Sequence, residues 1–244
     1  FMTGKTEKKT VLISDILSGE YEGKEVLLNG AVHKIRDMGE VAFVVLRTRE
    51  GLVQTVYEEG TTTPELKELC EEAAVTVKGT VALEERAPQG FEIRAVSFEI
   101  LSKPVEPMPI AINKWKMNTS LETKLDLRPL SLRNVKERAK FRVQEGIVRG
   151  FRDYLHSQGF TEIHSPKIGA RGAEGGANLF RLEYFHKHAV LAQSPQFYKQ
   201  MMVGVFDRVF EAAPVFRAEK HNTKRHLNEY TSLDFEMGYI EDYT

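Results

Sequence analysis

Three prolines within six residues divide the chain into two parts. Pro104, Pro107 and Pro109 stand in the stretch KPVEPMPIAINKWKMN, and prolines at this spacing stop regular secondary structure. The stretch predicts a linker at 103–133, between a domain at 1–102 and a second domain at 134–244. A chain of 244 residues is long enough for two ordinary domains.

Five short β-type runs precede the linker. They are rich in Val, Ile and Phe and are bounded by Gly, Pro or charged residues. A helix is expected at 64–74, after the third run, with Cys70 as a buried packing residue. Five strands with a helix after the third is the order of an OB barrel, whose strand 2–3 face binds single-stranded nucleic acid. Other small barrels share this spacing, so the order alone leaves the barrel type open. The runs are EVLLNGAVHKI, VAFVVLRT, LVQTVY, AVTVKGTVAL and GFEIRAVSFEIL.

The second part combines a long helix with strands. Apolar residues recur at helical spacing from Val135 to Leu155, and Gly159 predicts the end of that helix. Strand-like runs follow, which predicts an antiparallel sheet beside the helix. We therefore expect an α+β multidomain protein. The runs are FTEIHSP, AVLAQSP, RVFEAAPVFRAE and YTSLDFEMGYI.

Charge and cysteine content limit the partners and the compartment. The net charge is −1, so contact with nucleic acid must come from a local patch. One cysteine forms no internal disulfide, which suits a reducing compartment. No stretch approaches the ~18–20 apolar residues of a membrane span, and the start FMTGKTEKKT lacks the apolar core of a signal peptide. We expect a cytoplasmic protein without membrane contact.

Four stretches carry a resemblance to a known family. GFTEIHSPKI, EGGANLF, AQSPQFYKQ and FRAEKHNTKRHLNEYTSLDFEMGY resemble class II aminoacyl-tRNA synthetases, and in particular the archaeal and eukaryotic type of aspartyl-tRNA synthetase (class IIb). The resemblance implies an OB-fold anticodon-binding domain at 1–102. It also implies that 134–244 is the first part of a class II antiparallel-sheet catalytic domain.

The resemblance assigns ATP-binding and catalytic roles to the FRAE…RH motif. It implies that Arg217 clamps the substrate carboxylate and the α-phosphate, that Glu219 reads the adenine amino group, and that Arg225 and His226 hold ATP, with His226 near the γ-phosphate. Adenylate formation needs such cations, because charge builds on the transferring phosphoryl group. Outside the motif, a surface ion pair between Arg217 and Glu219 would be the simpler interpretation.

The aspartate pocket is expected from the other motifs. Gln196 and Lys199 carry specificity, since asparagine would leave the lysine ammonium unpaired at a cost of ~1–3 kcal/mol. Asparaginyl relatives usually have Glu in place of Lys199. The resemblance implies that Glu174 holds the substrate ammonium. Asp234 and Glu236 alternate on a strand, consistent either with a substrate-binding face or with a solvated core edge.

The barrel is expected to bind the anticodon. Phe43 offers a ring for stacking a base, worth ~1–3 kcal/mol, although core packing is the simpler interpretation of this residue alone. Arg36, Gln54 and Glu92 supply hydrogen bonds to base edges or phosphate.

His33 and Pro88 bear on the choice of tRNA. In this family, discriminating archaeal enzymes have Trp and Lys at these places, whereas non-discriminating ones have His and Pro. The hypothesis is that the enzyme charges both tRNA(Asp) and tRNA(Asn) with aspartate.

Part of the family's active site is not found within 1–244. The glycine-rich third motif is absent, and the ligands of the Mg²⁺ expected with ATP would lie beyond Thr244, so we expect an incomplete site that is inactive alone. Pro166 matches the first class II motif, which implies a homodimer. Two alternatives stay open: a non-catalytic tRNA-binding module, and an asparagine–tRNA ligase, which Lys199 disfavours.

Overall fold

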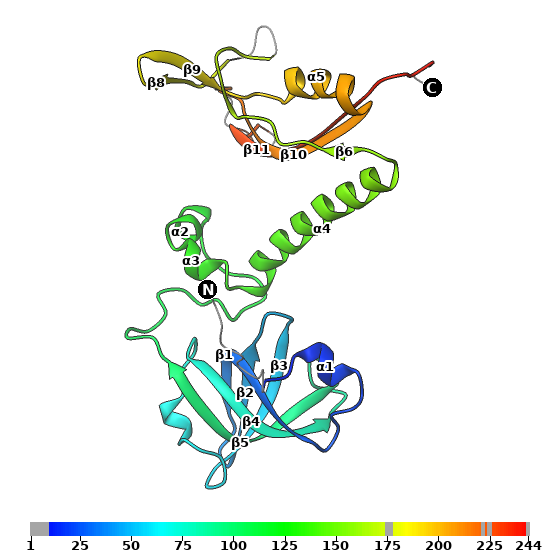
Figure 1. The fold of residues 1–244 in the computed structure, drawn as a ribbon. Helices are drawn as coiled ribbons and strands as arrows, with labels where there is room; N and C mark the ends of the chain where they lie inside the picture. The colour runs from blue at the N-terminus through cyan, green and yellow to red at the C-terminus, as the bar shows by residue number, and fades with distance from the viewer. Residues whose placement is uncertain (1–9, 174–177, 221–222, 224–225, 243–244) are drawn as a thin grey trace. The chain divides into compact units, whose positions relative to one another are not determined.

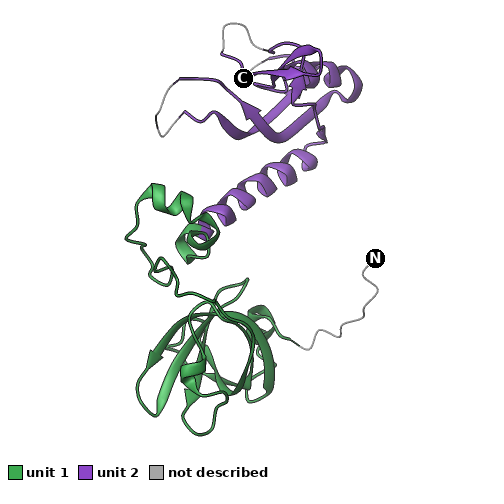
Figure 2. Cartoon of the chain, turned by 90° about the vertical axis from the view of Figure 1, so that its left-hand side faces the viewer, with its two compact units in different colours: residues 1–137 green, residues 138–244 purple. Residues whose placement is uncertain are grey.

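The chain forms two compact units, 1–137 and 138–244 (Figure 2). The computed structural model describes residues 10–173, 178–220, 223 and 226–242. Among these residues, no helix has both the length and the apolar character that crossing a membrane requires.

The first unit is built on a closed five-stranded barrel (Figure 1). The strand order is β1-β2-β3-β5-β4, and β4 pairs back onto β1. The OB barrel predicted from the five β-type runs is therefore confirmed. Its elements are α1 (Ile13–Leu17), β1 (Glu25–Asp37), β2 (Val41–Arg47), β3 (Leu52–Glu58), η1 (Leu66–Glu68), β4 (Ala74–Leu83) and β5 (Phe91–Ser102).

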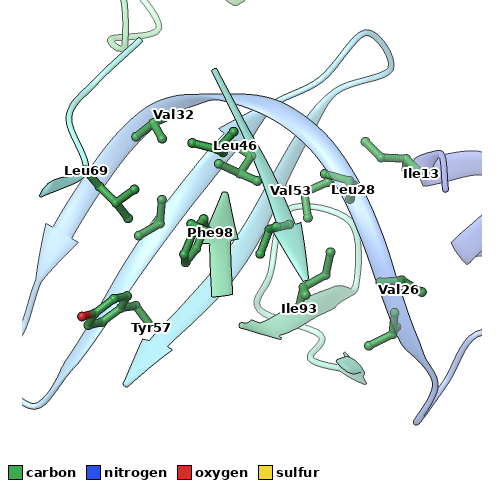
Figure 3. Packing of buried hydrophobic residues seen from close by; sticks show 14 of the residues in the cluster. Ile13, Val26, Leu28, Val32, Leu46, Val53, Tyr57, Leu69, Ile93 and Phe98 are labelled. Carbon is green, nitrogen blue, oxygen red and sulfur yellow. The ribbon is translucent and has the colours of Figure 1, made fainter. Parts of the chain in front are cut away.

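Apolar side chains that alternate along the strands fill the interior of the barrel. In β4 buried and partly exposed residues alternate along nearly the whole strand, because successive side chains of a strand point to opposite faces. Val32, Leu46, Val53, Ile93 and Phe98 meet in the interior (Figure 3). The outer face of the barrel is thereby left for polar residues.

The prediction of a helix at 64–74 is wrong, because only the single turn of η1 is helical in this stretch. The backbone of this segment bonds to β1 instead: Glu72 N–H donates to the oxygen of Val32 (2.7 Å), and Val32 N–H donates to that of Ala73 (2.8 Å). Strand pairing therefore outweighs the helix propensity of PELKELCEEA. Cys70 is half-buried and packs against the barrel core.

The segment after the barrel is ordered. It has no helix or strand until α2 (Leu121–Asp126) and α3 (Arg128–Ser131), as its prolines predict. The Asn134 side chain donates to the carbonyl oxygens of Ile112 (2.8 Å) and Lys114 (2.7 Å). This side chain ties the segment to the start of α4 (Val135–Ser157).

The second unit contains two small sheets and all of α4 except its first three residues. The helix ends before Gly159, whose φ of +76° favours glycine. One sheet has the order β11-β10-β6 and the other β7-β9-β8. Pairing is antiparallel, as predicted, except that β10 runs parallel to β6. The elements are β6 (Thr161–Glu162), β7 (Ile168–Gly169), β8 (Arg181–Tyr184), β9 (Lys187–Leu191), α5 (Gln196–Phe206), β10 (Arg208–Phe216) and β11 (Glu229–Met237).

Candidate active site and nucleic-acid face

Lys199 lies between two carboxylates of β11. Its ammonium nitrogen is 3.2 Å from Oδ1 of Asp234 and 3.5 Å from Oε2 of Glu236. The two acids are two positions apart on one strand, so they share a face. The Ser232 hydroxyl donates to the other oxygen of Asp234. An ammonium held in this way is fixed in position and lies beside acceptors for a second cation.

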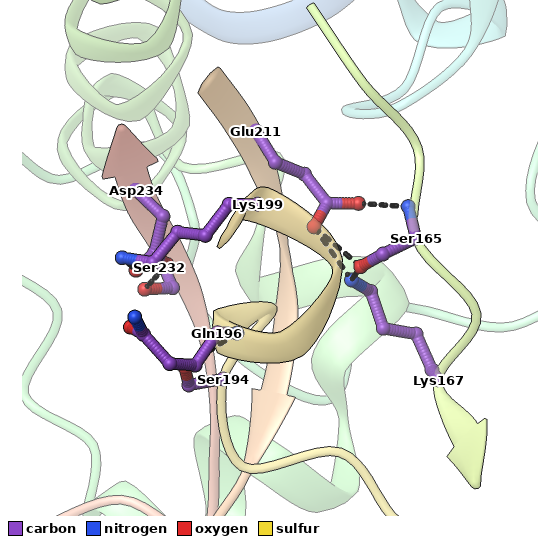
Figure 4. Close-up of polar contacts among 8 residues, drawn as sticks. All are labelled: Ser165, Lys167, Ser194, Gln196, Lys199, Glu211, Ser232 and Asp234. Atoms are coloured by element: carbon purple, nitrogen blue, oxygen red, sulfur yellow. Dashed lines mark hydrogen bonds and ion pairs between the residues drawn. The ribbon is translucent and has the colours of Figure 1, made fainter. Parts of the chain in front are cut away.

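The first residue of α5 adds an amide to this group. The backbone N–H of Gln196 donates to Oγ of Ser194 (3.0 Å), which fixes the start of the helix. Figure 4 shows Gln196 and Ser194 on the same side of α5 as Lys199 and Asp234. The structure therefore brings together three residues expected to bind aspartate.

A buried ion pair lies on the other side of α5. Glu211 on β10 is 2% exposed and accepts from the backbone N–H of Ser165 (2.6 Å), from its hydroxyl (2.6 Å) and from Nζ of Lys167 (3.0 Å) (Figure 4). The contacts fasten the segment around Pro166 to the sheet. This pairing was not predicted from the sequence.

Three residues expected to bind ATP line one cavity of about 420 Å³. They are Arg217, Glu219 and His226, joined by Leu227 and Tyr230. The cavity lies where the chain leaves β10 and enters β11. A forked cation, a carboxylate and an imidazole around one hollow can bind a phosphorylated nucleotide.

Asn228 holds the two sides of this turn together. Its side-chain amide donates to the backbone oxygens of Arg217 (2.9 Å) and Glu219 (3.1 Å). Its own backbone oxygen accepts from Arg217 N–H (2.9 Å). Glu174 and Arg225, also expected in the site, lie outside the described residues.

Sequence reasoning missed several residues of this region. Ser232 could have been found, because the period of two in YTSLDFEM places it on the face of Asp234 and Glu236. The same period places Tyr230 on this face. Asn228 precedes β11 and had no such pattern, so its position follows from the geometry of the turn between β10 and β11.

No cluster that could hold a metal ion is found in the part of the chain that the structure describes.

Four residues expected to bind the anticodon form a chain across the outer face of the barrel. Arg36 Nη2 donates to Oε1 of Gln54 (3.1 Å), and Gln54 Nε2 donates to Oε2 of Glu92 (3.1 Å). The Arg36 guanidinium carbon lies 5.6 Å from the centre of the Phe43 ring. Phe43 is half-buried and is absent from the core cluster, so one side of its ring can meet a base.

The two residues expected to set tRNA choice lie in β1 and in a loop. His33 is 6% exposed and lies beside Arg47, with 3.4 Å between its Nδ1 and Nη1 of the arginine. Pro88 is exposed in the loop between β4 and β5. Loops of this kind contribute to ligand binding in OB folds.

Two family models cover most of the chain. Residues 26–101 match the OB-fold nucleic acid binding domain, and residues 120–244 match the tRNA synthetases class II (D, K and N). The second match alone spans more than half of the 244 residues.

Curated relatives are similar over nearly the whole chain. An Aspartate--tRNA(Asp/Asn) ligase of Deinococcus radiodurans is 51% identical over 223 residues, which are 91% of this chain and 50% of the relative. A protein of the same name from Thermus thermophilus is 49% identical over 95% of this chain and 53% of its own. The chain spans about half the length of the curated relatives it matches.

Solved structures share the fold. The asparaginyl-tRNA synthetase of Pyrococcus horikoshii, complexed with asparaginyl-adenylate, superposes with a TM-score of 0.81 at 35% identity, over 91% of this chain and 51% of that one. The aspartyl tRNA synthetase of Entamoeba histolytica gives 0.75 at 32% identity, over 98% and 52%.

Proposed function

The chain belongs to the class II tRNA synthetases of the D, K and N group, and we propose that it forms the anticodon-binding barrel and the first part of the catalytic domain of an aspartate–tRNA ligase. Such an enzyme joins L-aspartate to the α-phosphate of ATP, which releases pyrophosphate and forms aspartyl-adenylate, and then transfers the aspartyl group to tRNA with release of AMP. The observation that carries the proposal is the Lys199 ammonium held between Asp234 and Glu236.

Charge balance in this pocket supports aspartate as the substrate. One ammonium and two carboxylates give the cluster a net charge of −1 (+1 − 2). The substrate ammonium complements Asp234 and Glu236, together with Glu174, while the side-chain carboxylate of the substrate complements Lys199. An asparagine amide carries no charge for Lys199 and would leave part of that pairing unmade, which is how a buried polar group rejects a near-isostere. Gln196 adds a neutral donor and acceptor to the same side.

The cavity around Arg217 is proposed to bind ATP. The Arg217 fork is suited to the substrate α-carboxylate and the α-phosphate, where charge builds during adenylate formation. Glu219 accepts from the adenine amino group, and His226 and Arg225 are proposed to bind the terminal phosphates. Asn228 holds the backbone of Arg217 and Glu219 in place. Mg²⁺ is proposed to accompany ATP through ligands other than the described residues.

The outer barrel face is proposed to bind the anticodon. Phe43 stacks on a base, and the chain from Arg36 through Gln54 to Glu92 supplies directed donors and acceptors. With His33 and Pro88, we propose that both tRNA(Asp) and tRNA(Asn) are accepted. The relatives named Aspartate--tRNA(Asp/Asn) ligase support this proposal.

Assembly and compartment complete the proposal. The segment around Pro166 is fixed to β10 by Glu211 and Lys167, and we propose that it contributes to a homodimer interface. A single cysteine and a tRNA substrate support a cytoplasmic enzyme.

The substrate assignment is tested by binding of two stable adenylate analogues, the aspartyl and the asparaginyl one, to the 244-residue chain. We expect the aspartyl analogue to bind at least tenfold more tightly. A preference for the asparaginyl analogue would indicate an asparagine–tRNA ligase. A chain that binds tRNA but neither of the two analogues would be a non-catalytic tRNA-binding module.

Aspartate-dependent exchange of pyrophosphate into ATP, with asparagine as control, tests whether the 244-residue chain can form the adenylate.

The choice of tRNA is a separate test. A tenfold or greater preference for tRNA(Asp) over tRNA(Asn) would contradict the proposal that both tRNAs are accepted.

A further inference from the structure

Two arginines share one buried carboxylate at the end of the barrel. The Glu72 side chain is 2% exposed. Arg47 donates to both of its oxygens, from Nη1 to Oε1 (2.5 Å) and from Nη2 to Oε2 (2.8 Å). Nη1 of Arg133 also donates to Oε2 (2.8 Å). Burial alone would raise the pKa of Glu72, but the hydrogen bonds and charges of Arg47 and Arg133 outweigh it and hold the pKa below its usual value. The carboxylate is therefore a charged, fixed acceptor at neutral pH.

The backbone of Glu72 is fixed as firmly as its side chain. Its φ is +68°, a left-handed conformation that residues with a Cβ adopt only where the surroundings impose it. The hydrogen bonds between residues 72–73 and Val32 impose it here. They place the carboxylate next to the irregular point of β1.

That irregular point is a β-bulge at His33. Val32 pairs with Leu46 and Lys34 pairs with Val45, so β1 has one residue more than β2 over this step. A bulge re-aims a side chain and recurs near functional sites. It turns His33 towards Arg47, which lies on the same face of β2 as Phe43 and Val45.

Arg47 also contacts His33. Its Nη1 lies 3.4 Å from Nδ1 of the ring, so the guanidinium that Glu72 holds restricts how the ring can turn. His33 is only 6% exposed. Only an edge of the ring is therefore accessible, and its orientation decides which atom a nucleic acid meets.

We propose that Glu72 is a positioning residue for reading the third anticodon base, at which tRNA(Asp) and tRNA(Asn) differ. By holding Arg47 through both oxygens, it fixes the orientation of His33. The inference rests on the proposed function, which assigns His33 to the anticodon. Glu72 would thus set the preference of the barrel between the two tRNAs without touching either.

The competing interpretation is purely structural, because Glu72 also binds Arg133 of the segment before α4. Arg133→Gln is the matched control. It removes the contact to that segment and leaves both Arg47 contacts in place. Arg47→Lys leaves the Arg133 contact in place and removes the forked contact of Arg47. An ammonium keeps the charge, but it cannot bind both oxygens of Glu72 as a fork while also facing His33.

The test titrates the 244-residue chain with two anticodon stem-loop RNAs that differ only in the third anticodon base, that of tRNA(Asp) or that of tRNA(Asn). We expect Glu72→Gln and Arg47→Lys to change the ratio of the two dissociation constants at least threefold, and Arg133→Gln to leave it unchanged. Loss of folding alone would weaken both RNAs equally. Should Glu72→Gln fail to fold, Arg47→Lys carries the test.

A double-mutant cycle shows whether Glu72 acts through His33. In a His33→Ala background, we expect Glu72→Gln or Arg47→Lys to have no further effect on the ratio. The same shift with and without His33 would overturn the inference, as would an unchanged ratio in folded Arg47→Lys. If the unmodified chain binds neither RNA, the proposed anticodon-binding function fails as well, which separates that failure from the failure of this inference alone.

Discussion

The ammonium nitrogen of Lys199 lies 3.2 Å from Oδ1 of Asp234, and both side chains are more than four-fifths buried. Glu236 approaches the same nitrogen at 3.5 Å. A lysine so placed needs no rearrangement to meet an incoming carboxylate, because its position is already fixed. The proposed aspartate site thus has its cation and its anions in place in the structure without a substrate.

Replacing Lys199 by Met removes the cation and leaves two carboxylates side by side. We expect the aspartyl-adenylate analogue to lose at least tenfold in affinity, because its side-chain carboxylate then faces like charges. The asparaginyl analogue should lose much less. Calorimetric titration of both analogues measures this, with the exposed Lys187→Met as control. Equal losses for the two analogues would argue against a role in selectivity.

Replacing Phe43 by Ala removes the stacking surface of the barrel. We expect RNA affinity to fall roughly 5- to 150-fold, since stacking of a base on an aromatic ring is worth ~1–3 kcal/mol. Thermal stability should change little, because Phe43 is absent from the core cluster. Fluorescence titration with an anticodon stem-loop measures the affinity. Phe185→Ala, which changes an 84% exposed ring of the other unit, should bind like the unmodified chain.

Glu72 should make the barrel sensitive to acid. Its pKa in the folded chain is held below the usual value of 4.5, so the carboxylate stabilises the fold above about pH 4.5 and this stability is lost as the pH falls through the folded pKa. Urea unfolding between pH 7 and pH 3 measures the effect. Glu72→Gln should lose roughly 3–5 kcal/mol at pH 7, because two arginines lose their counter-charge, and should show a weaker pH dependence. An unchanged pH profile would contradict this role.

Gly79 marks the tightest approach between β4 and β5. A Cβ there would overlap the backbone oxygen of Arg94 and lie 2.7 Å from Cγ2 of Ile93. Gly79→Ala should therefore destabilise the barrel by about 1–3 kcal/mol, as measured by thermal unfolding. Gly146→Ala is the control: nothing lies within 4 Å of its added Cβ, and in a helix the change should stabilise by about 0.5–1 kcal/mol. A Gly79→Ala chain as stable as the original would show that the strands separate easily.

Elements with a regular period of apolar residues were predictable from the sequence. The alternation of β4 and the helical period of α4 are visible residue by residue. The stretch 64–74 was misread because its good helix formers are overruled by pairing with β1. The helix α5 was not predicted. Its sequence, QFYKQMMVGVF, has no fully buried residue, so no clear apolar face indicates it, and Ser194, which bonds to Gln196, stands before Pro195 rather than directly next to the helix.

The candidate site was predictable where one motif or one strand holds its members. Lys199 and Asp234 came from separate motifs, and the sheet brings them together. The contact of Arg47 with His33 and Glu72 was not predictable. Its members are 14 and 25 residues apart, and they meet only because β1 bulges and the chain returns to it after β3.

The barrel closes on itself, since β1 pairs with both β2 and β4, whereas each sheet described in the second unit ends in two edge strands. A closed barrel forms its backbone hydrogen bonds within itself and needs no neighbouring sheet. Its amide protons should therefore exchange with heavy water more slowly than those of β8 or β11. Such a self-contained unit can be inherited, or joined to a different catalytic domain, without losing its ability to fold.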